Sequence, residues 1–307
     1  LWMMCKPLIS VSLCTFNRLE MLKMTMDSLL DQETGDLFEY EIVVVDDGSI
    51  DGTPEYLAAL CGSMEKSIRC FRENRAGVAA ARNRGVREAR GEWIAFLDDD
   101  EIADRKWLYE LYTAAKETGA HCLGGPCIPR APEKYKNRMK GTCRALFSGA
   151  DITGSRFIPG TGNAFVHRRV FDRVGLFDEK LRYHEDTDLF GRAKKAGCTI
   201  SIAKNARIFH IIPENRLQSG YLRKFSHTGG RELAQFHFKE RGTLLTAMNC
   251  TYRLSLIFKS LLFLLIAIIV HDEAGVMDHK CSIIFNGSYG KKCAGMFLRK
   301  IAGGWGS

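Results

Sequence analysis

The chain has 307 residues, of which 46% are hydrophobic and 26% charged, and its formal net charge is +8. A chain of this size and composition can bury a full core, so we expect one large folded domain with an appendage rather than a disordered or repetitive protein. Residues 204–253 hold nine Lys and Arg against three acids. No aromatic and basic stacking platform accompanies them, which argues against nucleic acid as a partner.

The first predicted element is a strand over residues 8–13, and a helix with apolar residues at helical spacing follows from Leu22 to Leu30. A strand, a polar turn and a helix together form the opening unit of a parallel sheet. The turn carries four side chains that could reach a ligand: Thr15, Asn17, Arg18 and Glu20.

Two later apolar runs, residues 42–45 and 93–97, are predicted strands that are buried on both faces. Acidic side chains follow each run at once: Asp46 and Asp47, then Asp98, Asp99 and Asp100. In open α/β sheets, ligands bind beyond the carboxyl ends of the strands, so both acidic groups should face one cleft.

Asp98 and Asp100 form an i, i+2 pair on an extended segment, so their carboxylates can converge on a hard divalent ion. Mg²⁺ and Mn²⁺ bind one or two carboxylates together with substrate phosphates, and a nucleotide diphosphate would complete such a site. The alternative is an acidic strand-to-loop turn that binds nothing.

Residues 74–85 combine small side chains with guanidinium groups in a predicted loop and helix start. Arg75 and Arg82 could bind a diphosphate, because the planar guanidinium fork matches phosphate oxygens. An Ala-rich surface helix with basic ends would show the same pattern.

The order of these motifs resembles that of family 2 glycosyltransferases, which are inverting enzymes with the glycosyltransferase A fold. The resemblance implies an α/β fold with a mostly parallel central sheet flanked by helices and a Rossmann-like nucleotide-binding half. We expect a catalytic domain over residues 1–225, with the nucleotide sugar bound by 7–125 and the acceptor by 126–225. Residues 226–307 would form a helical, basic and apolar region that associates with the membrane.

The resemblance also implies the roles of individual residues on the donor side. Asp100 would ligate Mn²⁺ or Mg²⁺ directly, while Asp98 would contact the ribose or the metal shell. The full donor site would consist of ten side chains: Thr15, Asn17, Arg18, Glu20, Asp46, Asp47, Arg75, Arg82, Asp98 and Asp99.

On the acceptor side, residues 158–165 resemble the Gly-rich acceptor loop of the family, and residues 185–189 resemble its E-D-x-D-L motif. An inverting transfer needs a carboxylate that takes the proton from the acceptor hydroxyl, and we predict that Asp186 is this base. Glu185 would orient the acceptor or the base. We interpret Asp188 as an acid that stabilises a helix N-terminus rather than as a reactant. The acceptor loop would contribute Gly160, Thr161, Gly162 and Asn163.

His210 lies just beyond the last predicted strand of the catalytic domain. Family members place a metal-binding histidine here, and imidazole is an acceptable Mn²⁺ ligand, so His210 would join Asp100 around the ion. The alternative is a hydrogen-bonded core histidine, which is the usual role of a lone histidine in an apolar strand.

The basic residues 204–253 directly precede an apolar segment, residues 254–270, which is at the lower length limit for a membrane span. Clustered bases beside an apolar helix suit the anionic cytoplasmic face of a membrane. We see no cleavable signal peptide, so we expect the catalytic domain at the cytoplasmic face, with the segment spanning the membrane or lying in its interface. A buried core helix is the alternative.

The predicted function is the transfer of a sugar from a nucleotide-diphosphate sugar, expected to be a UDP-sugar, to a saccharide or lipid-linked acceptor in cell-surface polysaccharide or glycolipid biosynthesis. Two alternatives remain: a nucleotide-sugar-binding protein without turnover, and a nucleotidyltransferase. The latter would need a Gly-rich basic loop after the first strand, which is missing here. The eleven cysteines lack a C-x-x-C pair and are expected to be reduced, mostly buried thiols.

Overall fold

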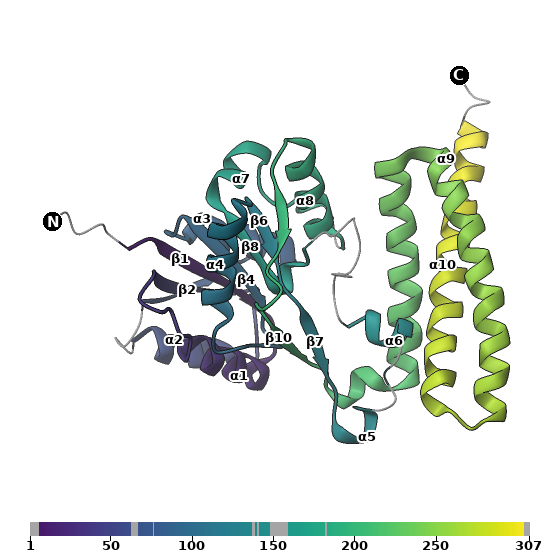
Figure 1. Cartoon of the computed structure of the whole chain (residues 1–307), viewed down its shortest axis with the longest axis horizontal. Coiled ribbons are helices and arrows are strands. Elements are labelled where there is room, and N and C mark those ends of the chain that lie inside the picture. Colours follow the sequence, from purple (N-terminus) through teal and green to yellow (C-terminus); the bar gives the residue numbers. More distant parts are fainter. Residues whose placement is uncertain are drawn as a thin grey trace. The chain divides into compact units, whose positions relative to one another are not determined.

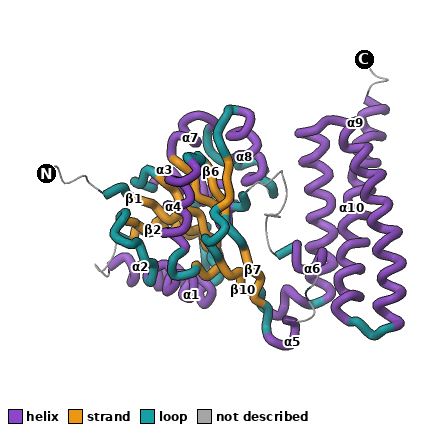
Figure 2. Tube along the Cα trace, viewed as in Figure 1, coloured by secondary structure: helices purple, strands orange, loops and turns teal. Residues whose placement is uncertain are grey.

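The computed structural model describes residues 6–62, 67–75, 77–136, 139, 141–147, 159–181 and 183–303. It divides into two compact units, which we call the sheet unit (Leu1–Pro129 and Ser148–Ile211) and the helical unit (Arg130–Phe147 and Ile212–Ser307). Figure 2 shows strands together with helices in the first unit, whereas the second unit is mainly helical. Residues 212–225 are part of the compact helical unit. The expected end of the catalytic domain at residue 225 stays a prediction.

The sheet unit is built on a seven-stranded sheet in the order β3-β2-β1-β4-β8-β6-β9. β1 pairs in parallel with β2 and β4, and β2 pairs in parallel with β3, whereas β8 is antiparallel to β4 and β6. The predicted α/β fold with a mostly parallel central sheet is therefore confirmed. The strands are β1 Leu8–Thr15, β2 Glu39–Asp46, β3 Ile68–Arg72, β4 Trp93–Asp98, β6 Cys122–Gly124, β8 Ala164–His167 and β9 Ile200–Ile202.

Helices cover both faces of this sheet, and successive residues of each strand alternate between the two cores. Along β4, Ala95 and Leu97 pack with residues of α1 (Leu19–Leu30) and α4 (Trp107–Thr118). Ile94 and Phe96 point the other way and pack with three helices: α3 Val78–Glu88, α7 Arg168–Val174 and α8 Glu185–Lys195. A further helix, α2 Thr53–Gly62, connects β2 to β3.

Helix α3 does not lie on the surface. Its residues Ala79, Ala80 and Ala81 are buried, and so are the polar side chains of Arg82 and Asn83. The Ala-rich surface helix is therefore the wrong interpretation of residues 74–85. The small side chains let this helix pack closely on the sheet, which brings Arg82 beneath the strand ends rather than into solvent.

A second, three-stranded sheet has the order β5-β10-β7. Its strands are β5 Glu101–Ala103, β7 Cys127–Arg130 and β10 Ile208–Ile211. β10 is antiparallel to β5 and pairs His210 with Glu101. This register places the imidazole next to the acidic residues that follow β4.

The helical unit consists mainly of α9 (Ser219–Ile269) and α10 (Glu273–Gly303). Gly242 interrupts α9 with a φ of 73°, a left-handed value that glycine adopts without steric cost. Figure 1 shows that the two segments of α9 run in opposite directions, with α10 packed along them. Three short elements precede α9: α5 Glu133–Lys136, α6 Gly141–Ala145 and the 3₁₀ turn η2 Glu214–Leu217.

The second segment of α9 is one apolar helix, Gly242–Ile269, that is long enough to cross a membrane. The mean hydropathy of its most apolar 18-residue window is 2.0, yet only 11% of that window is buried inside the protein. Large side chains such as Phe258 and Ile269 are 72% and 74% exposed. The buried core helix is therefore the wrong interpretation for residues 254–270, and this helix could anchor the chain in a membrane.

The cysteine prediction needs one correction. Cys61 at the end of α2 and Cys70 on β3 form a disulfide. The two cysteines are separated by 9 positions in the sequence, and this spacing alone did not suggest the pairing. The other described cysteines are free thiols, while Cys5 lies outside the described residues.

Candidate active site

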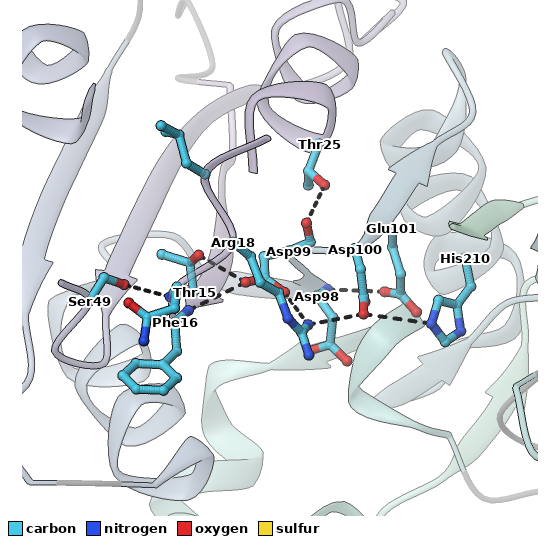
Figure 3. A network of polar contacts seen from close by, with 12 residues as sticks. Thr15, Phe16, Arg18, Thr25, Ser49, Asp98, Asp99, Asp100, Glu101 and His210 are labelled. Atoms are coloured by element: carbon cyan, nitrogen blue, oxygen red, sulfur yellow. Dashed lines mark hydrogen bonds and ion pairs between the residues drawn. The ribbon is translucent and has the colours of Figure 1, made fainter. Parts of the chain in front are cut away.

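The loop between β1 and α1 is tied to Asp99, as Figure 3 shows. The Asp99 carboxylate accepts hydrogen bonds from the Thr15 hydroxyl at 2.8 Å and from the Arg18 guanidinium at 2.7 Å. The Phe16 amide donates to the same carboxylate at 3.4 Å, and the Asp99 carbonyl accepts from Thr25 at 3.0 Å. Burial raises the pKa of Asp99, although Arg18 opposes this shift. Asp99 thus positions the loop that carries three of the predicted donor residues.

Asp100 lies between two basic side chains. Its Oδ2 atom is 3.0 Å from Arg18 Nη1 and 3.7 Å from His210 Nε2. Oxygen and nitrogen ligands that lie about 2.1 Å from one Mg²⁺ or Mn²⁺ ion are themselves roughly 3 Å apart. The Asp100 and His210 atoms therefore need to move little to share an ion, and the residues present fit a divalent metal.

Two neighbours of His210 were not predicted. Single ligand atoms of Glu101, Cys127 and His210 all lie within 4.8 Å of one another. Glu101 is buried, its Oε2 atom accepts from the Asp98 backbone amide at 3.0 Å, and its Oε1 atom is 3.8 Å from Cys127 Sγ. Burial and the charges of Asp98 and Asp100 raise the pKa of Glu101 well above its usual range. The sequence did contain a signal for Glu101, because it is the fourth acidic residue of the run 98–101.

This raised pKa predicts how stability depends on pH. At pH values between the ordinary pKa of Glu and the raised pKa of Glu101, the folded chain binds a proton that the unfolded chain releases. The free energy of unfolding therefore falls as the pH rises through this range. We expect Glu101→Gln to remove this dependence and to be more stable than the native chain at neutral pH. The urea midpoint measured from pH 4 to pH 8 with a chelator present tests this.

The control for that experiment is Glu55→Gln, since Glu55 is exposed in the first turn of α2. It should leave the pH profile as it is in the native chain. A Glu101→Gln profile parallel to the native one would contradict a protonated Glu101.

Arg82 joins the donor strands to helix α8. Its Nη2 atom lies 2.9 Å from Asp98 Oδ1, and its Nη1 atom donates a short hydrogen bond to Glu185 Oε1. Although burial opposes the charged form, the Asp98 and Glu185 carboxylates raise the pKa of Arg82, so it stays a guanidinium. Burial in turn raises the pKa of Glu185, against the effect of Arg82. The arginine thus brings Asp98 and Glu185 together, and the buried charges of Arg82 and Glu185 compensate each other.

We expect Arg82→Lys to lower the free energy of unfolding by about 1.5–3 kcal/mol, because an ammonium cannot make both charged hydrogen bonds that the planar fork makes. Urea denaturation measures this loss. Arg87→Lys is the matched control, since Arg87 is exposed on the same helix. Equal stability of the two variants would show that the Arg82 bridge contributes little.

Asp186 begins helix α8 beside Glu185. Its Oδ1 atom accepts from the amide of Thr187 at 2.6 Å and from the Thr187 hydroxyl at 3.1 Å, while a Cβ added to Gly160 would lie 3.8 Å from Oδ2. The predicted acceptor loop and the predicted base are therefore neighbours. Asp188 instead accepts from Arg192 at 2.8 Å, one turn along the helix.

The remainder of the acceptor loop packs into the scaffold. Asn163 is buried, accepts from Trp107 Nε1 at 2.8 Å and donates to the carbonyls of Pro126 and Ala206. Thr161 is buried as well, and a Cβ on Gly162 would lie 2.3 Å from Glu101 Oε1. These contacts indicate that Asn163 and Gly162 hold the loop in position. Ile158, the first residue of the predicted loop, lies outside the described residues.

The loop after β2 is fastened to the loop after β1. The Asn17 amide donates to Ser49 Oγ at 2.8 Å, and Asn17 Oδ1 accepts from the Ile50 amide at 2.8 Å. Asp46 accepts from the Ser49 amide at 2.8 Å, while Asp47 accepts from the Gly77 amide at the start of α3. The structure thus brings these predicted donor residues to one end of the sheet.

Two predicted donor residues have other partners. Arg75 contacts Glu73 and Glu179, each at 3.0 Å, and its hydrogen bond to Glu73 lowers the pKa of that carboxyl to about 2. Glu20 forms an exposed ion pair with Lys23 at 2.8 Å. The structure therefore does not join these two side chains to the acidic run that follows β4, as far as the described residues go.

Comparisons with known proteins identify relatives of moderate sequence identity. Glycosyltransferase AglE from Haloferax volcanii is 28% identical over 203 residues, which cover 64% of each chain. Succinoglycan biosynthesis protein ExoM from Rhizobium meliloti is 28% identical over 242 residues, which cover 74% of this chain and 75% of the relative. The chain thus spans a little less than two thirds of the Haloferax relative.

Solved structures show the same fold at low sequence identity. The mannosyltransferase PcManGT from Pyrobaculum calidifontis, in complex with GDP-Man and Mn²⁺, has a TM-score of 0.63 at 18% identity over 94% of this chain and 88% of its own. Residues 1–349 of S. aureus TarS, in complex with UDP, have a TM-score of 0.52 at 17% identity over 92% and 90%.

Two family models match the chain. Glycosyl transferase family group 2 matches residues 93–277, and Glycosyl transferase family 2 matches residues 10–175, which is more than half of the chain and includes the strand ends that carry Asp46, Asp98 and Asp100. The chain belongs to glycosyl transferase family 2.

Proposed function

We propose that the chain transfers a sugar from a nucleotide-diphosphate sugar to a saccharide or lipid-linked acceptor, with inversion at the anomeric carbon and with help from Mn²⁺ or Mg²⁺. The observation that carries the proposal is the Arg82 bridge. It ties Asp98 at the end of β4 to Glu185 at the start of α8, which supports a single site that uses the acidic run after β4 together with the neighbouring Asp186. The titles of two structural neighbours, which name GDP-Man with Mn²⁺ and UDP, support the donor class.

In this mechanism, Asp186 accepts the proton of the acceptor hydroxyl while that oxygen attacks the anomeric carbon of the donor. The hydrogen bonds from Thr187 hold one Asp186 oxygen, which leaves the other beside the backbone of Gly160. Glu185 is fixed by Arg82 and so orients the base. No covalent intermediate between sugar and enzyme is needed.

On the donor side, Asp100 and His210 would hold the divalent ion, with Asp98 contributing to its shell. Such an ion neutralises the charge that develops on a departing diphosphate. The remaining donor contacts would come from the loops after β1 and β2, which Asp99 and Asn17 hold in place. Asp46, Asp47 and Arg18 are the side chains there that we assign to the nucleotide.

The place of action that we propose is the cytoplasmic face of a membrane. The apolar helix Gly242–Ile269 would provide the anchor, and the basic residues before it would meet anionic headgroups. The relatives' names include succinoglycan and minor teichoic acid biosynthesis, which favours a cell-envelope polysaccharide or glycolipid as the product.

The experiment that tests the function is a donor screen in detergent. UDP-, GDP- and dTDP-sugars are added to the solubilised chain with Mn²⁺, and nucleotide release is measured with and without a chelator. We expect metal-dependent release from one donor, and the anomeric configuration of the product, read by NMR, tests inversion. Tight nucleotide binding without release from any donor and any candidate acceptor would favour a binding protein. Release of pyrophosphate from a sugar phosphate and a nucleoside triphosphate would favour a nucleotidyltransferase.

A further inference from the structure

The helical unit contains two adjoining cavities that the glycosyl transfer site does not use. The larger has a volume of about 740 Å³ and the smaller of about 510 Å³, and all their described lining residues belong to the helical unit. Both volumes lie within the range of about 300–1,000 Å³ that is usual for ligand sites. Gly220, Arg223 and Ile284 line both cavities, so the two adjoin.

The larger cavity is mainly apolar. Its walls come from η2, from the beginning and the end of α9, and from α10: Leu217, Leu222, Ala267, Ile268, Met277 and Ile284. Two of these residues, Ala267 and Ile268, belong to the apolar helix that could enter a membrane. Their neighbours Ile266 and Ile269 are 45% and 74% exposed. The cavity wall is therefore continuous with the surface that would contact lipid.

The smaller cavity differs from the larger in the charge of its lining. Arg223, Lys224, His227 and Lys291 line it, and no carboxylate does so among the described residues. Within the described part of the chain, Arg223, Lys224 and Lys291 form no ion pair with an acid. Three cationic side chains around one space without a counter-charge are suited to an anion that accepts several hydrogen bonds.

We propose that these cavities bind one membrane lipid phosphate, with its hydrocarbon chain in the larger cavity and its phosphate among Arg223, Lys224 and Lys291 in the smaller. Arg223 lines both spaces and marks the junction between chain and headgroup. Free phosphate would leave the apolar cavity unfilled, and an uncharged lipid would leave the three cations without a partner. A lipid with a phosphate monoester or diphosphate matches both cavities at once.

Gly220 gives this proposal a clean test. It lines both cavities, and a Cβ added there would meet no atom within 4 Å. Gly220→Leu should therefore fill the junction without displacing the fold. Gly295→Leu is the matched control, because Gly295 lies in α10, has the same open space and lines neither cavity.

The probe is a C15 isoprenyl monophosphate, titrated into the full chain in a non-ionic detergent and followed by calorimetry. The C15 alcohol and inorganic phosphate are titrated separately. We expect the lipid phosphate to bind more tightly than either, and Gly220→Leu to weaken it by roughly tenfold or more while Gly295→Leu does not. Arg223→Gln removes a charged hydrogen bond and should also weaken binding by roughly tenfold.

Three outcomes would overturn the proposal. Inorganic phosphate that binds as tightly as the lipid phosphate would indicate a simple anion site. Binding of the lipid phosphate that is unchanged in both Gly220→Leu and Arg223→Gln would place it elsewhere on the chain. No binding by the folded native chain would exclude the site. Asp100→Asn should bind the lipid phosphate as the native chain does, so loss of glycosyl transfer and loss of lipid binding can be told apart.

Discussion

Replacing Asp186 by Asn should lower the rate of glycosyl transfer by roughly 10²–10⁴-fold, which is the usual contribution of a general base. The amide is isosteric and can still accept from Thr187 through its oxygen, so the start of α8 should keep its structure. It cannot take a proton from the acceptor. We expect the loss in kcat, with the affinity for the nucleotide unchanged, because Arg82 still fixes Glu185 and Asp98.

Asp188→Asn is the matched control, two residues further along the same helix. Asp188 contacts Arg192, which in turn donates to the carbonyls of Val174 and Leu176, so the control should lower stability and leave kcat near the native value. Single-turnover measurements of product and equilibrium binding of nucleotide separate the two effects. If Asp186→Asn retained native kcat, the base would have to be another residue.

Replacing Asp100 by Asn should lower metal-dependent transfer by roughly 10³-fold, because a metal ligand supports several kcal/mol of transition-state stabilisation. The variant should also bind Mn²⁺ more weakly, which thermal unfolding measures as a smaller rise in Tm on addition of the ion. The measured quantity is the rise in Tm on adding Mn²⁺ rather than Tm itself, because Asp100→Asn also removes the ion pair with Arg18.

Asp104→Asn provides the comparison for this experiment, because Asp104 follows β5 and pairs with Arg207 away from His210. It should leave the response of Tm to Mn²⁺ at the native size. A native response in Asp100→Asn would rule out Asp100 as a metal ligand, whatever happened to transfer.

Local patterns in the sequence were sufficient for the strands and the acidic loops. Residues 93–97 form a strand because their side chains are apolar on both faces of a sheet that helices cover on both sides. Residues 8–13 place Ile9, Val11 and Leu13 in one core, and the small buried side chains of Ser10 and Ser12 face the other way. The carboxyl ends of parallel strands meet at one edge, so the sequence alone was enough to place Asp46 and Asp98 together.

What the sequence could not provide was the choice of partner for each side chain. Asn163 lies in a Gly-rich segment typical of a ligand loop, yet its side-chain amide forms hydrogen bonds with Trp107 and two backbone carbonyls. The cluster of Glu101, Cys127 and His210 arises only when β5, β7 and β10 form their own sheet. Such contacts depend on pairings between segments that lie far apart along the chain, and spacing does not encode them.

The guanidinium of Arg18 lies 2.7 Å from Asp99 and 3.0 Å from Asp100. This arginine is therefore the counter-ion of both carboxylates. A divalent metal that approaches Asp100 must compete with this arginine, whereas a diphosphate would give Arg18 a new anion. Metal and nucleotide should therefore bind with positive coupling, each strengthening the other by the same factor. Titration of Mn²⁺ with and without UDP would measure that factor, and Arg18→Gln should reduce it toward one.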